Sequence, residues 1–221
     1  MSDCLLEGKN VTKHYDEGRI QALRGVDLAV NASEFVAITG PSGSGKSTLL
    51  QLLGGLDQPT SGEILFRGHS LANSFDLDSY RSRRVGFVFQ AFHLLPTLRA
   101  LENVQIPMFE TKLGLREREA KAAELLREVG LEHRLQQYPN QLSAGERQRT
   151  AIARSLANDP EILLADEPTG NLDSENSAKI MALLTGIQAK RNMVLVIVTH
   201  ESAIAQLAQR TIHIRDGRIS S

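Results

Sequence analysis

A glycine-rich segment around residue 45 constrains this chain more strongly than any other part of the sequence. Its residues, in order, are Gly40, Pro41, Ser42, Gly43, Ser44, Gly45, Lys46, Ser47 and Thr48. The apolar run 34–39 before it indicates a buried strand, and the run 48–53 after it indicates a helix. A G-x-x-x-x-G-K-[ST] pattern on a strand-to-helix turn is typical of a loop that binds phosphate. A flexible loop before an ordinary helix is the simpler interpretation, but it does not account for the lysine and the serine.

Each part of this pattern has a physical use in holding a nucleotide. Gly43 and Gly45 can adopt backbone conformations closed to other residues, so that successive N–H groups can surround a phosphate. The helix that follows directs its partly positive N-terminus at the same anion. We expect the Lys46 ammonium to contact the β- and γ-phosphates and the Ser47 hydroxyl to ligate Mg²⁺.

The length and charge of the chain limit the kinds of protein it can be. Its 221 residues suit one large domain, with or without a sub-lobe, and its 25 Lys and Arg nearly balance its 26 Asp and Glu. No basic block stands out, so nucleic acid is not expected as a partner. The single Cys4 excludes an intramolecular disulfide and fits a reducing compartment. The N-terminus lacks a signal-peptide layout, and apolar runs such as 193–198 fall short of the ~20 residues that cross a bilayer. We therefore expect a soluble chain whose role at a membrane depends on a partner.

The first 141 residues indicate strands followed by a helical segment. Alternating apolar and polar residues, interrupted by turn residues, predict strands at 4–15, 20–30, 34–39, 62–68 and 85–90. The few helices between these early strands indicate an antiparallel layer beside the phosphate loop. From about 91 to 141 the pattern becomes helical, with helices expected at 100–109 and 116–129.

The last third of the chain alternates strands and helices, which is typical of a parallel sheet. Strands are expected at 162–165 and 193–198, and helices at 174–190 and 202–208. A hairpin around Asp216 and Gly217 follows. We predict one α/β domain over 4–221, with a mostly parallel core sheet. Its core and antiparallel β subdomain occupy about 4–90 and 142–221, and an α-helical subdomain is inserted at about 91–141.

Two acidic residues follow the apolar strand 162–165. Because α/β sheets bind ligands at the carboxyl ends of their strands, Asp166 is placed to hold Mg²⁺ directly or through water. Glu167, the next residue, could take a proton from an attacking water, a role worth about 10²–10⁴-fold in rate. An Asp-Glu pair after a strand is also a common turn feature, but the phosphate loop earlier in the chain favours the catalytic interpretation.

The segment 142–146 marks the start of another helix. Its residues are Leu142, Ser143, Ala144, Gly145 and Glu146, and the helix is expected from Arg147 to Ala157. Ser143 directly before the start of a helix indicates a second potential anion-binding site. The alternative is an ordinary capping box, in which Ser143 is the N-cap and Glu146 stands at N3.

Together these motifs resemble the ATP-binding-cassette (ABC) ATPase family, and the resemblance covers essentially the whole chain. It implies that segment 142–146 is the signature motif, which contacts ATP held by the partner subunit. It also implies that Gln90 senses Mg²⁺ and the attacking water, that His200 is the switch histidine and that Tyr15 stacks on adenine. The D-loop of the family corresponds to Asn171, Leu172 and Asp173.

The signature departs from the usual Leu-Ser-Gly-Gly-Gln at two positions. Ala144 replaces a glycine, which adds only a methyl group and is tolerated unless the φ angle is positive. Glu146 replaces the glutamine, while Ser143 and Gly145, which face the phosphate in the family, are kept. We therefore expect a working ATPase.

The resemblance also implies the assembly and its ligands. ATP and Mg²⁺ are the expected cofactors, with Ser47, Gln90 and Asp166 at the metal and Glu167, His200 and Gln90 as catalytic groups. The chain is expected to form a head-to-tail homodimer around two ATP and to drive integral membrane transporter subunits from the cytoplasmic side of the inner membrane. The residues of segments 80–81, 87–92 and 166–173 are similar to those of the lipoprotein-releasing and macrolide-efflux exporters.

Two other functions compete with this interpretation. A soluble ABC-type ATPase of DNA repair or translation usually carries two cassettes or a long coiled-coil insertion, and neither is found in these 221 residues. A P-loop kinase of a small metabolite would have no use for segment 142–146. The apolar stretch 91–98 and the helix 101–109 are expected to form a groove for a helix of the membrane subunit, unless Phe92, Leu94 and Leu95 simply pack the lobe onto the core.

Overall fold

The structure, a computed structural model, describes residues 4–220 of the chain. Its strands are β1 (Cys4–Tyr15), β2 (Ile20–Asn31), β3 (Phe35–Thr39), β4 (Ser61–Phe66), β5 (His69–Ser70), β6 (Val85–Phe89), β7 (Ile162–Asp166), β8 (Val194–Val198), β9 (Arg210–Arg215) and β10 (Arg218–Ser220). Its α-helices are α1 (Lys46–Leu53), α2 (Leu71–Ser74), α3 (Leu77–Arg84), α4 (Ala100–Gln105), α5 (Leu115–Glu128), α6 (Ala144–Ser155), α7 (Ser174–Arg191) and α8 (Ser202–Ala205). Short 3₁₀ helices are η1 (Asp16–Gly18), η2 (Ile106–Glu110) and η3 (Pro139–Gln141).

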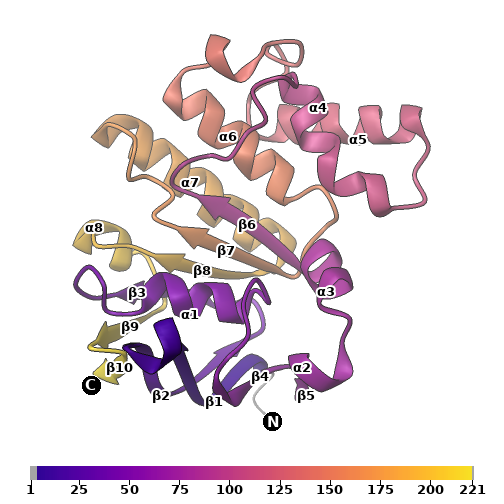
Figure 1. The fold of residues 1–221 in the computed structure, drawn as a ribbon. Helices are drawn as coiled ribbons and strands as arrows, with labels where there is room; N and C mark the ends of the chain where they lie inside the picture. Colours follow the sequence, from indigo (N-terminus) through magenta and orange to yellow (C-terminus); the bar gives the residue numbers. More distant parts are fainter. Residues whose placement is uncertain (1–3, 221) are drawn as a thin grey trace.

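A six-stranded sheet lies at the centre of the molecule, in the order β10-β9-β3-β8-β7-β6 (Figure 1). All its strands are parallel except β10, which pairs antiparallel with β9 at one edge. β3 and β8 are buried along their whole length, as expected of strands in a parallel sheet covered on both faces. Val36 and Ile38 enter the core that contains α1, whereas Phe35 enters the core that contains α6 and α7.

The strand order brings separated parts of the chain to one edge of the sheet. Parallel strands end on the same side, so the residues that follow β3, β6, β7 and β8 lie along a common edge. These residues include the phosphate loop, Gln90, Glu167 and His200.

A second, antiparallel sheet has the order β2-β1-β4-β5 and lies in the lower part of Figure 1. The predicted hairpin forms from β1 and β2, with Tyr15 opposite Ile20 at its closed end. The structure thus confirms an α/β fold with a mostly parallel core sheet and an antiparallel β layer.

Helices α4 and α5 lie at the upper right of Figure 1, away from the antiparallel sheet. They pack with α6 around a continuous core that includes Val104, Met108, Leu126 and Ile152. The division of the chain at about residues 90 and 142 remains our proposal, and this grouping of helices supports it.

Several predicted boundaries were wrong for local reasons. The helix expected at 100–109 stops being α-helical at Gln105, because Pro107 cannot donate a main-chain hydrogen bond, and η2 follows. The strand expected to reach residue 68 ends at Phe66, where Arg67 and Gly68 both have positive φ. The helix expected from Arg147 already begins at Ala144. Helices α2 and α3 were not predicted.

No helix in the part of the chain that the structure describes is both long and apolar enough to span a bilayer.

Candidate functional site

The phosphate loop has the backbone that its glycines allow. Gly40, Gly43 and Gly45 have φ angles of 146°, 75° and 104°. A Cβ on Gly40 would lie 2.0 Å from the Ile214 carbonyl oxygen, and one on Gly45 would lie 2.3 Å from the Ala22 carbonyl oxygen. Only glycine therefore fits these two positions, and the loop is held close against β2 and β9.

Lys46 folds back over this loop. Its ammonium donates hydrogen bonds to the carbonyl oxygens of Gly40 (2.9 Å) and Pro41 (2.8 Å), and its side chain is largely buried. The Ser44 hydroxyl is buried without a hydrogen-bond partner among the described residues. A concave loop with a cation, an unpaired hydroxyl and a helix N-terminus is suited to a phosphate group.

A pocket of about 630 Å³ opens in front of the loop. Its lining includes Ser42, Gly43, Gly45, Lys46, Ser47 and Thr48 of the loop, Tyr15, Ile20, Gln21 and Ala22 of the β subdomain, and Glu167 and His200. Its size and shape admit a nucleotide with its phosphates on the loop. Segment 142–146 does not contribute to this lining.

Ser47 and Asp166 form the candidate metal site. The Ser47 hydroxyl donates to Asp166 Oδ1 at 3.0 Å, and Asp166 is the last residue of β7. Burial raises the pKa of the Asp166 carboxyl, and the negative charge of Glu167 acts in the same direction. Residues 4–220 contain no group of three or more His, Cys, Asp or Glu side chains arranged for a metal. A cation here would need phosphate oxygens and water as further ligands, which fits Mg²⁺ that binds together with a nucleotide.

Glu167 and His200 meet at the edge of the pocket. Glu167 follows β7 and His200 follows β8 by two residues, and His200 Nδ1 lies 3.0 Å from Glu167 Oε1. Glu167 has a positive φ of 46°, which turns its side chain out of the strand direction. The predicted base and the predicted switch histidine are therefore in direct contact.

Tyr15 lines the same pocket from the β subdomain. Its hydroxyl donates to Asp57 Oδ2 at 2.9 Å, and the Lys13 ammonium lies 4.9 Å from the ring centroid while bonding Asp57 Oδ1 at 2.7 Å. Ile20, which is 56% exposed, faces the same pocket opposite Tyr15. Ile20 was not among the predicted site residues, although the hairpin register alone places it beside Tyr15.

Gln90 stands just beyond β6 and is exposed, outside the pocket lining. The Asn171 side-chain amide donates to the main-chain carbonyl oxygen of Gln90 at 2.8 Å, and the Gln90 carboxamide lies against Gly170, where a Cβ would come within 2.6 Å of its Nε2 atom. No hydrogen bond in the described part of the chain joins its side chain to Ser47 or Asp166. Its role at the metal therefore remains a prediction.

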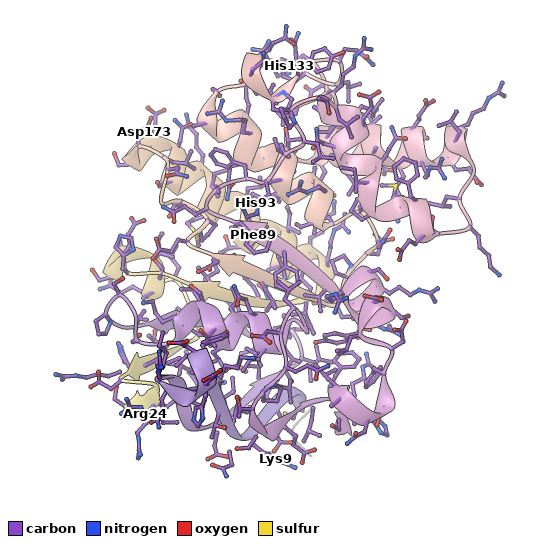
Figure 2. The ribbon with its side chains drawn as sticks, viewed as in Figure 1. Lys9, Arg24, Phe89, His93, His133 and Asp173 are labelled. Atoms are coloured by element: carbon purple, nitrogen blue, oxygen red, sulfur yellow. The ribbon has the colours of Figure 1, made fainter. Side chains whose placement is uncertain are left out.

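The chain turns sharply after Gln90. Phe92 and His93 both have positive φ, and the guanidinium of Arg154 on α6 donates to both of their carbonyl oxygens. The centroids of the His93 and Phe89 rings are 4.9 Å apart, and Figure 2 labels the two residues next to each other. Helix α6 therefore holds the segment that follows Gln90.

The signature residues form the start of α6 and are a capping box. Ser143 Oγ accepts from the Glu146 main-chain N–H at 3.2 Å, and Glu146 Oε2 accepts from the Ser143 N–H at 2.8 Å. Glu146 Oε1 also accepts from Arg134 Nε at 2.8 Å. The Ser143 N–H, together with Arg134, lowers the pKa of the Glu146 carboxyl. Ala144 has no positive φ, so its methyl group introduces no backbone strain.

The remaining signature and D-loop residues divide between the core and the surface. Leu142 is buried and Leu172 packs against the same core, so both have structural roles. Asp173 is exposed and caps α7 by accepting from the Asn176 N–H at 2.8 Å. Figure 2 places Asp173 at the upper left, on the side of the molecule where α7 begins.

Comparison with known proteins gives close relatives over the whole length. The chain is 47% identical over 219 residues to the lipoprotein-releasing system ATP-binding protein LolD of Psychrobacter arcticus, covering 97% of each. It is 47% identical over 226 residues to the pyoverdine export ATP-binding/permease protein PvdT of Pseudomonas fluorescens, covering 100% of this chain and 34% of that protein. A solved dimer of the ATP-binding cassette MJ0796 in a post-hydrolysis state with ADP and Pi superposes with a TM-score of 0.89 at 43% identity, covering 98% of this chain and 97% of that one.

A family model described as ABC transporter matches residues 23–170, which include the phosphate loop, the signature segment and the Asp166–Glu167 pair. The relatives cover the rest of the chain, and the solved structures show the same fold. The resemblance inferred from the motifs is confirmed, and this chain belongs to the ABC transporter family.

Proposed function

We propose that this chain is the ATP-hydrolysing subunit of a membrane transporter of the exporting or lipoprotein-releasing type. The observation that carries the proposal is that the phosphate loop, Ser47, Glu167 and His200 all line the same pocket. The names of LolD and PvdT, one lipoprotein-releasing and one exporting, support the class of transporter. The same relatives disfavour a soluble ATPase of DNA repair or translation.

The residues of the pocket have distinct tasks in hydrolysis. The loop N–H groups and Lys46 hold the β- and γ-phosphates of ATP. Ser47 and Asp166 would hold Mg²⁺, and the bound ion would supply positive charge against the phosphates. Glu167 takes a proton from the water that attacks the γ-phosphorus, while the bond to the bridging oxygen breaks and ADP keeps that electron pair. His200, bonded to Glu167 Oε1, orients the carboxylate.

A complete site requires a second copy of the chain. Segment 142–146 lies on α6, in the upper part of Figure 1, and takes no part in the pocket of its own chain. The Ser143 side chain is exposed at the start of this helix and can therefore meet an ATP bound by a partner. The dimeric cassette MJ0796, bound to ADP and Pi, supports this head-to-tail homodimer.

Glu167→Gln tests the assignment of the base. The amide keeps the shape and hydrogen bonding of the side chain but cannot take a proton, so turnover should fall by about 10²-fold or more. ATP should still bind, and the variant should run as an ATP-dependent dimer on size exclusion. Glu175→Gln, an exposed change on α7, is the matched control. Normal hydrolysis by Glu167→Gln would show that another group is the base.

The membrane subunit is proposed to dock beside Gln90, at the cytoplasmic face of the inner membrane. A groove of about 320 Å³ lies between β6, η2 and α6, with Phe87, Phe89, Ile106 and Pro107 in its lining. The lining contains no residue of the stretch 91–98, which was expected to form the groove; Leu95 and Phe109 lie outside it and are 47% and 61% exposed. Phe92, Leu94 and Leu98 are half-buried, so that part of the stretch 91–98 packs onto the protein.

Leu95→Ser combined with Phe109→Ser tests this docking surface, because both side chains are exposed and their loss leaves the core intact. ATPase activity and Tm of the isolated chain should stay near wild type, while co-purification with membranes that contain the transporter subunit should be lost. Leu207→Ser removes an equally exposed leucine after α8 and should keep membrane association. Unchanged association of the double variant would end the docking hypothesis.

A further inference from the structure

Helix α6 connects the signature residues to the interior of the same chain. Ser143 caps its first turn, and five residues later the side chain of Gln148 is fully buried. The Gln148 Nε2 atom donates a hydrogen bond to the carbonyl oxygen of Pro168 at 2.6 Å. Pro168 directly follows Glu167, so α6 contacts the main chain of the turn that carries the carboxylate.

A glutamine is costly at this position. Gln148 has an exposed fraction of 0%, and its Oε1 atom has no hydrogen-bond partner among residues 4–220. Burying an unpaired carbonyl oxygen costs free energy that an apolar side chain of the same size would avoid. The bond to Pro168 therefore has a use beyond packing.

Several hydrogen bonds hold this turn, including the one from Thr169 Oγ1 to Glu201 (2.9 Å), and among the described residues only the bond from Gln148 comes from α6. Glu167 is in the left-handed region with φ 46°, which non-glycine residues rarely adopt. The Glu167 N–H donates to Val198 (3.0 Å), and the Gly170 N–H donates to the Glu167 carbonyl oxygen (3.1 Å). Pro168 has no N–H, so its carbonyl is the one main-chain group through which that residue can be held.

We propose that Gln148 is a positioning residue for Glu167 and links the signature helix to the catalytic carboxylate of the same chain. The inference rests on the proposed roles of Glu167 and Ser143. When Ser143 meets the ATP of the partner, a shift of α6 reaches the chain's own Glu167 turn through one hydrogen bond. Hydrolysis at one site is thereby made to depend on engagement of the other.

The first test compares two glutamines whose side chains donate hydrogen bonds to main-chain carbonyl oxygens. Gln148→Met removes the bond to Pro168, and Gln188→Met removes the bond from Gln188 Nε2 on α7 to the Ser33 carbonyl (2.8 Å). Steady-state kinetics of the full chain should show kcat reduced about tenfold in Gln148→Met, which is about 1.4 kcal/mol in the barrier, with KM for ATP within about twofold. A reduction no larger than that of Gln188→Met, or a rise in KM alone, would overturn the proposal.

The second test uses Gln148→Glu and a pH profile, and it also serves if Gln148→Met does not fold. A protonated carboxyl can donate to the Pro168 carbonyl but a carboxylate cannot, and burial raises the pKa of a carboxyl. The ratio of variant to wild-type kcat should therefore fall as pH rises, whereas the ratio for Gln148→Met should stay constant. A constant ratio for Gln148→Glu would refute the positioning role. If Glu167→Gln also hydrolysed ATP normally, the proposed function itself would have failed.

Discussion

Glu146, the residue that departs from the usual signature glutamine, is expected to stabilise the helix start through its charge. Its carboxylate accepts from the Ser143 N–H and from Arg134 Nε, both at 2.8 Å, and its side chain is 14% exposed. A hydrogen bond to a charged group contributes about 1.5–3 kcal/mol. The Arg134 side chain is 38% exposed, so solvent screening limits the ion pair to about 0.2–1 kcal/mol.

These magnitudes separate two substitutions at Glu146. Glu146→Ala loses the cap and the ion pair, about 2–4 kcal/mol in the free energy of unfolding. Glu146→Gln keeps a capping side chain and loses the charge, about 0.5–1.5 kcal/mol including the helix dipole. For a chain of this length each kcal/mol lowers Tm by roughly 2–4 °C.

Because Glu146 stabilises the fold through its charge, this stabilisation depends on pH. The folded-state pKa of Glu146 lies below its usual value, so its stabilisation is present above the unfolded pKa of about 4.3. It is lost as pH falls through the folded pKa, when the carboxylate becomes protonated. The difference between wild type and Glu146→Gln should therefore be largest near neutral pH and shrink in acid.

Urea unfolding followed by circular dichroism measures these differences, with the exposed Glu119→Gln on α5 as the matched control. A double-mutant cycle with Arg134→Ala isolates the ion pair. The reasoning is refuted if Glu146→Gln destabilises as much as Glu146→Ala. It is equally refuted if Glu146→Gln has the same effect with and without Arg134.

Three further outcomes are expected. Lys46→Ala should abolish ATP binding or turnover, because the phosphates lose their main cation. Nucleotide binding and phosphate release measure this, and wild-type turnover would show that the loop is not part of the ATP site. Lys46→Ala and Ser143→Ala chains should recover part of their activity when mixed, since one site of the heterodimer keeps both groups; no recovery in proven heterodimers would place the whole site in one chain. Gly45→Ala should weaken ATP binding at least as much as it lowers Tm, because its Cβ would lie 2.3 Å from the Ala22 carbonyl oxygen and forces the loop to move; unchanged affinity would contradict the geometry of the loop.

The sequence alone determined the parts of the site that lie close together along the chain. The strand, the phosphate loop and α1 follow one another without interruption from residue 35 to 53, so their pattern is visible locally. The capping box of Ser143 and Glu146 is likewise a three-residue relation along one helix start. Such features depend on backbone sterics and neighbouring hydrogen bonds, which the order of residues specifies directly.

Only the tertiary structure decided which distant residues meet. Glu167 and His200 are 33 residues apart in the chain, and they touch because β7 and β8 are neighbours in the sheet. The bond from Gln148 to Pro168 arose from the packing of α6 on β6, which is the neighbour of β7 in the sheet. Strand order and helix packing are set by the burial of whole apolar faces, which many local patterns satisfy equally well. The separation of Ser143 from the pocket of its own chain has the same origin, and it is what makes a second chain part of the site.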